Sequence, residues 1–381
     1  ETDIVINENS GYAYPVGVSG SSYNGGPIFI NIQNPTNPVL EGGFGDEGYT
    51  HDAQVVNYNG PDVDHIGKEI FIGCNEDKIV IVDVSDKINP AVISIVDYPS
   101  NEYTHQGWLT EDSRFFIVGD ELDEQNVGMN TRTIVFDFTD LDNPVLSFEY
   151  FSNNMSIDHN GYAVGDSFFL ASYRGGMREL NILNIDNQNI NEVGFFDTYP
   201  GDDNAAFNGV WNVYPFFESG NIVLSDIEKG LFVVKKSNWL FYKSNMKKLD
   251  IIKYFFIPLM AACSSDNNFG EETNNSAEIL NIKTLGGSGN ESAQSVVNTS
   301  DGGYVVVGYT QSSDGDVEIK NNFSYDYWII KFDEEGQQEW QRFYGGSKDD
   351  KAEKIIKTKD QGYAIVGRSK SNDMDVNNNE G

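Results

Sequence analysis

Three of the four histidines recur at one position of a repeated pattern. The triplets are Thr50-His51-Asp52, Thr104-His105-Gln106 and Asp158-His159-Asn160, and successive histidines lie 54 residues apart. The next unit has Phe207-Asn208-Gly209, with asparagine in place of histidine. Imidazole nitrogens are ligands for Zn, Fe, Ni and Cu. If the repeats bring the three rings together, a divalent metal ion could be the cofactor.

Acidic residues near these histidines could complete such a centre. Asp52 and Asp158 are directly adjacent to a histidine, and Glu121 lies between the second and third copies. We expect these three acids to be ligands or to orient the ligands. Alternatively, each histidine caps a turn or hydrogen-bonds to the neighbouring unit, and both interpretations remain open. His65 is off this register and is interpreted as a loop residue.

One run of residues concentrates negative charge. Asp120-Glu121-Leu122-Asp123-Glu124 places four carboxylates in five residues. This run could be half of a Ca²⁺ site or an acid pair, with Arg174 or Arg178 as its counter-charge, but a solvated loop is the favoured interpretation. The sequence contains no Ser-His-Asp order, nucleophile elbow or phosphate loop.

The residues around the histidines form a repeat of about fifty residues. Each copy has an apolar strand that runs into an acidic turn and ends at Asn-Pro, where the side chains close the turn and proline ends the pairing. Further strand-like runs precede and follow each copy, which gives four strands per unit. Four short strands repeated at this period predict the blades of a β-propeller. The clearest copies begin at Ile28, Ile79 and Thr133.

These motifs resemble a known group of exported proteins. Ile79-Val80-Ile81-Val82-Asp83 is similar to the LVIVD repeat of bacterial and archaeal surface proteins. The wider stretch from 1 to 240 resembles the choice-of-anchor B group. The resemblance implies an extracellular propeller with no defined biochemical activity. Because the chain starts at Glu1, without a signal, we expect N-terminal blades to be missing and the ring to be incomplete.

A segment in the middle of the chain has the composition of an export signal. Met246-Lys247-Lys248 is followed by the apolar run 254–262 and then by Cys263. Met260-Ala261-Ala262-Cys263 resembles the lipobox of bacterial lipoproteins, which implies lipidation of Cys263. The run is far shorter than the roughly 20 residues of a membrane-spanning helix. A short buried helix or strand is the alternative. We therefore expect that this sequence joins two separate proteins into one chain.

A different repeat follows the polar stretch after Cys263. Gly286-Gly287-Ser288 recurs as Gly345-Gly346-Ser347, and Asp301-Gly302-Gly303-Tyr304 recurs as Asp360-Gln361-Gly362-Tyr363, both 59 residues later. This pattern resembles the propeller-like repeats of bacterial surface lipoproteins. Its second unit stops at Gly381, so we expect this part to be truncated as well, and marginally stable alone.

Composition restricts the partners of the chain. The formal net charge is −34, from 59 acidic and 25 basic residues, and it would repel a phosphate backbone. Nucleic acid is therefore excluded as a partner. The two cysteines, Cys74 and Cys263, lie in different halves. A disulfide between them is not expected, so stability must come from packing.

These observations combine into one prediction. The fold class is all-β: an incomplete β-propeller of about four to five four-stranded blades, then a short apolar segment that could be helical, then a second propeller-like fragment. The expected function is non-enzymatic binding of an extracellular protein or carbohydrate at the cell surface, and the alternative is a metal-dependent hydrolase or lyase that uses the histidines. Membrane attachment is expected only through Cys263, if the second half is a separate protein. The predicted segments are a propeller fragment at 1–240, a signal-like segment at 246–263, a tether at 264–278 and repeats of period 59 at 279–381.

Overall fold

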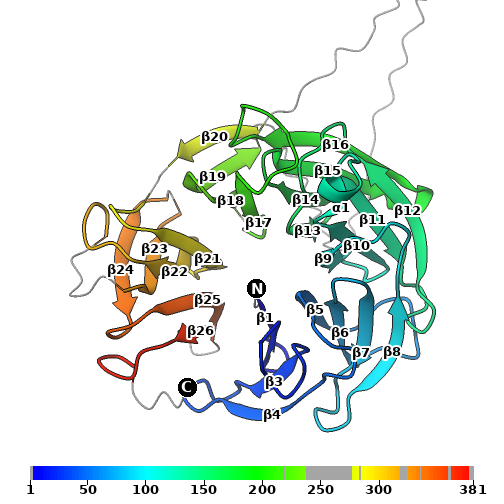
Figure 1. Ribbon diagram of the computed structural model, residues 1–381, viewed down its shortest axis with the longest axis horizontal. Helices are drawn as coiled ribbons and strands as arrows, with labels where there is room; N and C mark the ends of the chain where they lie inside the picture. The colour runs from blue at the N-terminus through cyan, green and yellow to red at the C-terminus, as the bar shows by residue number, and fades with distance from the viewer. Residues whose placement is uncertain are drawn as a thin grey trace, which may run out of the picture.

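The computed structural model shows a ring of small β-sheets around a central channel (Figure 1). It describes residues 3–217, 219–236, 277–282, 285–317, 324–334, 336–358 and 362–376. Within these ranges there are six antiparallel sheets of four strands and one sheet of two strands. We number the four-stranded sheets as blades one to six in chain order. The first strand of each sheet lies innermost, facing the channel (Figure 1).

The first four blades come from the histidine-containing repeat. Blade one contains β1 (Asp3–Asn7), β2 (Tyr12–Val16), β3 (Ile28–Asn31) and β4 (Val39–Gly43). Blade two contains β5 (Asp52–Asn57), β6 (Glu69–Cys74), β7 (Ile79–Asp83) and β8 (Ala91–Val96). Blade three contains β9 (Thr104–Leu109), β10 (Phe115–Asp120), β11 (Arg132–Asp137) and β12 (Val145–Phe151). Blade four contains β13 (Gly161–Val164), β14 (Ser167–Ser172), β15 (Gly176–Asn184) and β16 (Asn189–Phe196).

The remaining sheets complete the ring. Blade five contains β17 (Val210–Tyr214), β18 (Asn221–Asp226), β19 (Gly230–Lys236) and β20 (Ala277–Ile282). Blade six contains β21 (Glu291–Asn298), β22 (Tyr304–Thr310), β23 (Asp326–Phe332) and β24 (Gln338–Tyr344). The two-stranded sheet contains β25 (Asp350–Lys357) and β26 (Tyr363–Ser369). The described helices are the single turn α1 (Asp123–Asn126) and the 3₁₀ turn η1 (Ile185–Asn187).

The middle strands of the blades are apolar on both faces, because a neighbouring blade covers each face. Every residue of β6 and of β10 is buried, whereas every residue of the outer strand β8 is exposed or half-buried. The hydrophobic cores accordingly lie between blades. One core joins Ile70 and Ile81 of blade two to Phe116 and Phe136 of blade three. Continuous short apolar runs are therefore the expected signature of these strands.

The acidic turn of the repeat forms as the sequence predicts. Asp83 Oδ1 accepts a hydrogen bond from the backbone N–H of Ser85 at 3.0 Å. In the next blade, Asp137 Oδ1 accepts from the N–H of Thr139 at 2.9 Å. These local bonds end the third strand and return the chain toward the fourth.

The prediction of an incomplete propeller with four to five blades is wrong. Six four-stranded blades stand in one ring, and both repeat types contribute to it. β20 pairs with β19 and completes blade five, and β25 contacts β1 as well as β21 and β22. Although the two repeats differ in motif, each encodes a sheet with two apolar faces, so blades of both kinds can pack together. Blades five and six share one core, with Phe217 and Val223 against Tyr304 and Trp328.

Other predictions concern residues outside the described ranges. The segment at 246–263 with Cys263 lies there, and so does the tether at 264–278 apart from residues 277 and 278, which belong to β20. The division of the chain into segments stays a prediction. Cys74 is a free thiol buried in the core between blades two and three. Among the described residues, no helix combines the length and apolar character needed to cross a membrane.

We expect the two parts of the ring to remain associated after the backbone is cut. A protease site inserted between residues 237 and 276 would separate β1–β19 from β20–β26, which meet through the β19–β20 pairing and the core shared by blades five and six. The cut protein should elute from size exclusion as one species. In a Val306→Asp background the parts should separate, because a charge buried in that core is costly. Separate elution of the unmutated parts would contradict this prediction.

Candidate metal centre

The ring brings the three repeat histidines together. His51 precedes β5, His105 lies in β9, and His159 lies two residues before β13. These three innermost strands are neighbours around the channel (Figure 1). The ring centroids of His51 and His105 are 4.5 Å apart, and those of His105 and His159 are 4.3 Å apart. The 54-residue spacing therefore places equivalent side chains in direct contact, and all three are buried.

Glu121 joins two of these histidines into one group. It directly follows β10, and its Oε2 lies 3.7 Å from His105 Nε2. Its Oε1 lies 3.7 Å from His159 Nε2 and accepts a hydrogen bond from the Tyr173 hydroxyl at 2.8 Å. One ligand atom from each of His105, Glu121 and His159 can be chosen so that all three lie within 4.8 Å of one another. Tyr173, at the end of β14, thus orients the carboxylate.

Hydrogen bonding determines which ring nitrogen of His159 has a lone pair free to bind a metal ion. Nδ1 lies 2.5 Å from the backbone carbonyl oxygen of Trp211. A carbonyl oxygen can only accept, so Nδ1 carries the proton and Nε2 keeps its lone pair. This lone pair is on the side of Glu121. A histidine that donates its second N–H to a backbone carbonyl is the usual arrangement of a metal ligand.

Burial keeps the two ligand histidines uncharged. It lowers the pKa of His159 to about 3, and it lowers the pKa of His105 well below its usual value, with His159 and His51 adding to the effect. Neither ring nitrogen of His105 has a hydrogen-bond partner in the described structure. Neutral imidazoles with available lone pairs can bind a cation without first losing a proton.

The spacing suits a first-row transition metal. Bonds of about 2.0–2.1 Å in tetrahedral geometry place ligand atoms about 3.4 Å apart. The observed nitrogen–oxygen distances of 3.7 Å are close to this value. Two imidazoles and one carboxylate form a donor set that Zn²⁺ and similar ions accept, with further coordination positions left for water or a ligand.

His51 lies beside this group. Its Nδ1 contacts the hydroxyl of Tyr103 at 2.9 Å and that of Tyr49 at 3.2 Å. Burial lowers the pKa of His51 to about 4. Its ring packs on His105, so it borders the space next to the three ligand atoms.

The structure does not bring Asp52 and Asp158 into the group of mutually close ligand atoms. Neighbouring residues in an extended chain point to opposite sides, so an acid beside a histidine is directed away from it. Asp52 interacts electrostatically with Asp3 and Lys354, and burial raises its pKa well above the usual value. Asp158 lies against Gly119, where a Cβ atom would be 2.3 Å from Asp158 Oδ2.

The favoured interpretation of the acidic run as a solvated loop is wrong. Asp120 and Asp123 are 0% exposed and Glu124 is 2% exposed. Their run continues from β10 into the single turn α1. The sequence does not indicate this burial, because four acids in five residues are typical of protein surfaces.

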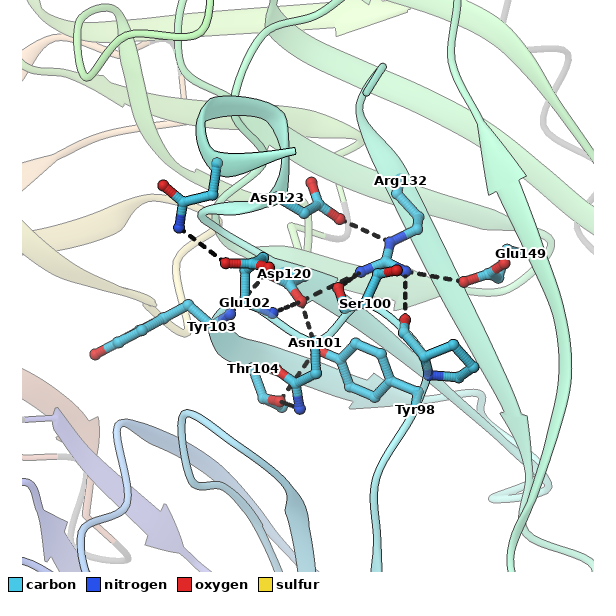
Figure 2. A network of polar contacts seen from close by, with 12 residues as sticks. Tyr98, Ser100, Asn101, Glu102, Tyr103, Thr104, Asp120, Asp123, Arg132 and Glu149 are labelled. Carbon is cyan, nitrogen blue, oxygen red and sulfur yellow. Dashed lines mark hydrogen bonds and ion pairs between the residues drawn. The ribbon is translucent and has the colours of Figure 1, made fainter. Parts of the chain in front are cut away.

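Arg132 is the counter-charge that the sequence did not reveal. Its guanidinium bonds to Asp123 at 2.7 Å, Glu149 at 3.0 Å and Asp120 at 3.3 Å (Figure 2). It also donates to the backbone carbonyls of Pro99 and Ser100. Five donors in a rigid fork suit this central position.

The arginines expected to pair with the acidic run bond elsewhere. Arg174 pairs with Asp202 at 2.8 Å, and Arg178 pairs with Glu192 at 3.4 Å. Only the tertiary structure brings β11, which carries Arg132, next to the run.

A second cluster of possible metal ligands consists of Asp62, His65 and Asp142, and its polar atoms already bond to protein groups. His65 lies in the loop between β5 and β6, and its Nε2 bonds to Asp142 at 2.9 Å. Lys68 Nζ contacts its Nδ1 at 3.1 Å, and Asp62 Oδ2 accepts from the N–H of Leu141. These bonds tie blade two to blade three, which gives His65 a structural role.

Comparison with known proteins identifies the fold. No family model matches this chain, and no curated protein matches it in sequence. Among solved structures it is similar to the periplasmic gluconolactonase PpgL of Pseudomonas aeruginosa, with a TM-score of 0.58 and 10% identity over 92% of this chain and 87% of that chain.

Two further solved structures resemble the chain more distantly. The dihydro-heme d1 dehydrogenase NirN in complex with DHE has a TM-score of 0.48 and 13% identity over 97% of this chain and 61% of that chain. Kuenenia stuttgartiensis hydrazine synthase has a TM-score of 0.47 and 10% identity over 78% of this chain and 68% of that chain. The similarity to the gluconolactonase, at 10% identity, shows the fold alone. The chain is a β-propeller protein.

Arg132→Met should strongly destabilise the fold. The change removes the cation that bonds to two fully buried carboxylates, Asp120 and Asp123, a loss that typically costs about 3–5 kcal/mol. Arg114→Met is the matched control, because Arg114 is partly exposed and pairs with Asp137 and Asp186 at the surface. Its cost should stay within about 1 kcal/mol. Urea unfolding measures both values, and equal losses would refute the central role of Arg132.

Glu124→Gln should change how stability depends on pH. Burial, together with Asp158 and Asp123, raises the pKa of Glu124 to about 11 in the folded state, from 4.5 in an unfolded chain. The folded state then holds a proton that the unfolded state lacks between these values, so this group's contribution to stability falls as pH rises. Glutamine does not titrate. In buffer that contains a chelator, urea unfolding should show that the free energy of unfolding of the variant, relative to wild type, rises from pH 5 to pH 9.

The exposed Glu102 provides the control for this pH experiment. Glu102 accepts a bond from Asn126 of α1 at 3.0 Å and lies at the surface. Glu102→Gln, a surface substitution, should keep the free energy of unfolding within about 0.5 kcal/mol of wild type. Parallel profiles for wild type and Glu124→Gln would contradict the assignment of the raised pKa.

Proposed function

We propose that this protein is an exported β-propeller that binds a divalent transition-metal ion in its channel and, through that ion, an extracellular ligand. The observation that supports it most directly is that one carboxylate, Glu121, lies 3.7 Å from Nε2 of both His105 and His159. A divalent ion at this position would interact favourably with the half-buried Glu121 carboxylate. His105, His159 and Glu121 would hold it, while Tyr173 and the Trp211 carbonyl orient two of these ligands.

The location proposed for this function comes from sequence motifs. The LVIVD-like repeats and the similarity to the choice-of-anchor B group support an extracellular or cell-surface protein. The lipobox-like end of the segment 246–263 supports lipidation at Cys263, as the first residue of a second protein. The partner we propose is an extracellular protein or carbohydrate, since the charge of −34 disfavours nucleic acid.

The donor set favours a second candidate function, metal-assisted hydrolysis. Two histidines and one glutamate are also the protein ligands of some hydrolytic Zn²⁺ sites, where a water molecule occupies the fourth position. A bound Zn²⁺ ion would lower the pKa of that water to about 7 and so would supply a nucleophile. His51, whose ring lies 4.5 Å from that of His105, would then border the metal-bound water.

His105→Ala and His159→Ala should abolish transition-metal binding. Wild-type protein incubated with Zn²⁺ and desalted should retain about one ion per chain by elemental analysis, whereas each variant should lose it because two ligands remain. Tyr173→Phe removes only the bond that orients Glu121, and should weaken binding about 10–100-fold. His65→Ala is the matched control, since its nitrogens are already bonded to Asp142 and Lys68.

The same variants separate the two candidate functions. Turnover of ester or lactone substrates by the Zn²⁺-loaded protein, lost in His105→Ala and retained in His65→Ala, would establish hydrolysis. Metal binding without turnover supports the binding function. Equal metal content in wild type and both channel variants would refute the proposed centre.

A further inference from the structure

Two buried carboxylates next to the proposed metal centre have no partner. Both oxygens of Glu124 and both oxygens of Asp158 lack a hydrogen bond in the described structure. The two residues are 2% and 1% exposed. Buried polar groups are nearly always hydrogen-bonded, and an isolated buried charge is strongly unfavourable. Four such oxygens in one region therefore require an explanation.

These two side chains come from different parts of blade three and its junction with blade four. Glu124 belongs to α1, and Asp158 lies in the segment between β12 and β13. Asp158 is the charge that acts most strongly on Glu124. Gly119 leaves room for the Asp158 carboxylate, because any Cβ there would lie 2.3 Å from its Oδ2. Gly119 belongs to β10 and Glu124 follows that strand closely, so both carboxylates are buried near the end of β10.

The nearby positive charge is the guanidinium of Arg132, and its donors already bond to other groups. Arg132 bonds to Asp120, Asp123 and Glu149, and its remaining donors reach backbone carbonyls. The charges that act most strongly on Asp158 are three carboxylates, of Asp123, Asp120 and Glu121, and one cation, Arg132. No described cation is left to balance Glu124 and Asp158 in their ionised forms, which is why Glu124 keeps its proton when no metal ion is bound. A bound cation is the compensation that such a set of oxygens suits.

We propose that Glu124 and Asp158 bind a hard divalent cation, of the Ca²⁺ and Mg²⁺ class, in a second site beside the transition-metal centre. Carboxylate oxygens without nitrogen or sulfur ligands select hard cations. Backbone carbonyls and water would have to complete the six to eight oxygens that Ca²⁺ takes, or the six of Mg²⁺. The site has its own ligands and does not depend on the proposed function.

A cation in this second site would also help to position residues of the transition-metal centre. Asp158 is adjacent to His159, and α1 follows Glu121 after a single residue. A cation bound by Glu124 and Asp158 joins α1 to the segment that leads into β13. It therefore holds in place the two chain segments that carry Glu121 and His159.

Calorimetry with Ca²⁺ on the full chain, after removal of metals by chelation, tests the site directly. We expect saturable binding with a Kd of about 10⁻³ M or tighter, as in extracellular calcium modules. Glu124→Gln and Asp158→Asn, which keep the side-chain shapes, should weaken Ca²⁺ binding at least tenfold. Glu102→Gln, an exposed carboxylate near α1, is the matched control and should bind as wild type does. Mg²⁺ titrated in a parallel experiment should compete with Ca²⁺.

The two proposed sites can fail separately. His105→Ala should retain Ca²⁺ binding while it loses Zn²⁺, and Glu124→Gln should retain Zn²⁺, which also shows that the variant is folded. No binding of Ca²⁺ or Mg²⁺ by wild type at millimolar concentration would overturn the proposal. Unchanged Ca²⁺ affinity in both Glu124→Gln and Asp158→Asn would overturn it as well.

Discussion

Packing between blades is the interaction on which the rest of this structure depends. A sheet such as β5–β8 is apolar on both faces, so it is stable only when another sheet covers each face. The cores confirm this arrangement, because each joins residues of two neighbouring sheets, from the first pair of blades to the contact of Val307 in blade six with Ala352 in β25. A chain of such sheets closes into a ring. The ring in turn brings the first strands of successive blades together at the channel.

The candidate site follows from this geometry. Because β5, β9 and β13 are neighbours, one position of the repeat occurs three times within a few ångströms, and His105 contacts both His51 and His159. The same close packing excludes water from the imidazoles, which keeps them neutral. It also leaves carboxylates buried in the interior. Arg132 balances part of that charge, and the two proposed cation sites would balance more of it. The polar interior of blade three is thus a consequence of building a channel from acidic repeats.

The sequence predicted the local features well. The strands, the acidic turns at Asp83 and Asp137, and the shared position of the histidines follow from periodicity and spacing, which depend on nearby residues. Glu121 was one of three candidate acids, and the structure brings it alone to the histidines, because Asp52 and Asp158 are adjacent to a histidine in extended chain. Arg132 and Tyr173 carried no local signal. Their partners lie on other strands, and pairing between strands is not visible in a single segment.

The sequence by itself determined that this chain builds four-stranded blades and that three histidines occupy equivalent places in them. Only the tertiary structure decided how many blades share one ring, that repeats of two kinds pack together, and that the acidic run from Asp120 to Glu124 is buried. The physical reason is the range of the interactions. Strand periodicity and turns act over a few residues, whereas apolar faces accept any complementary face, and the burial of a charge depends on what the whole ring places around it.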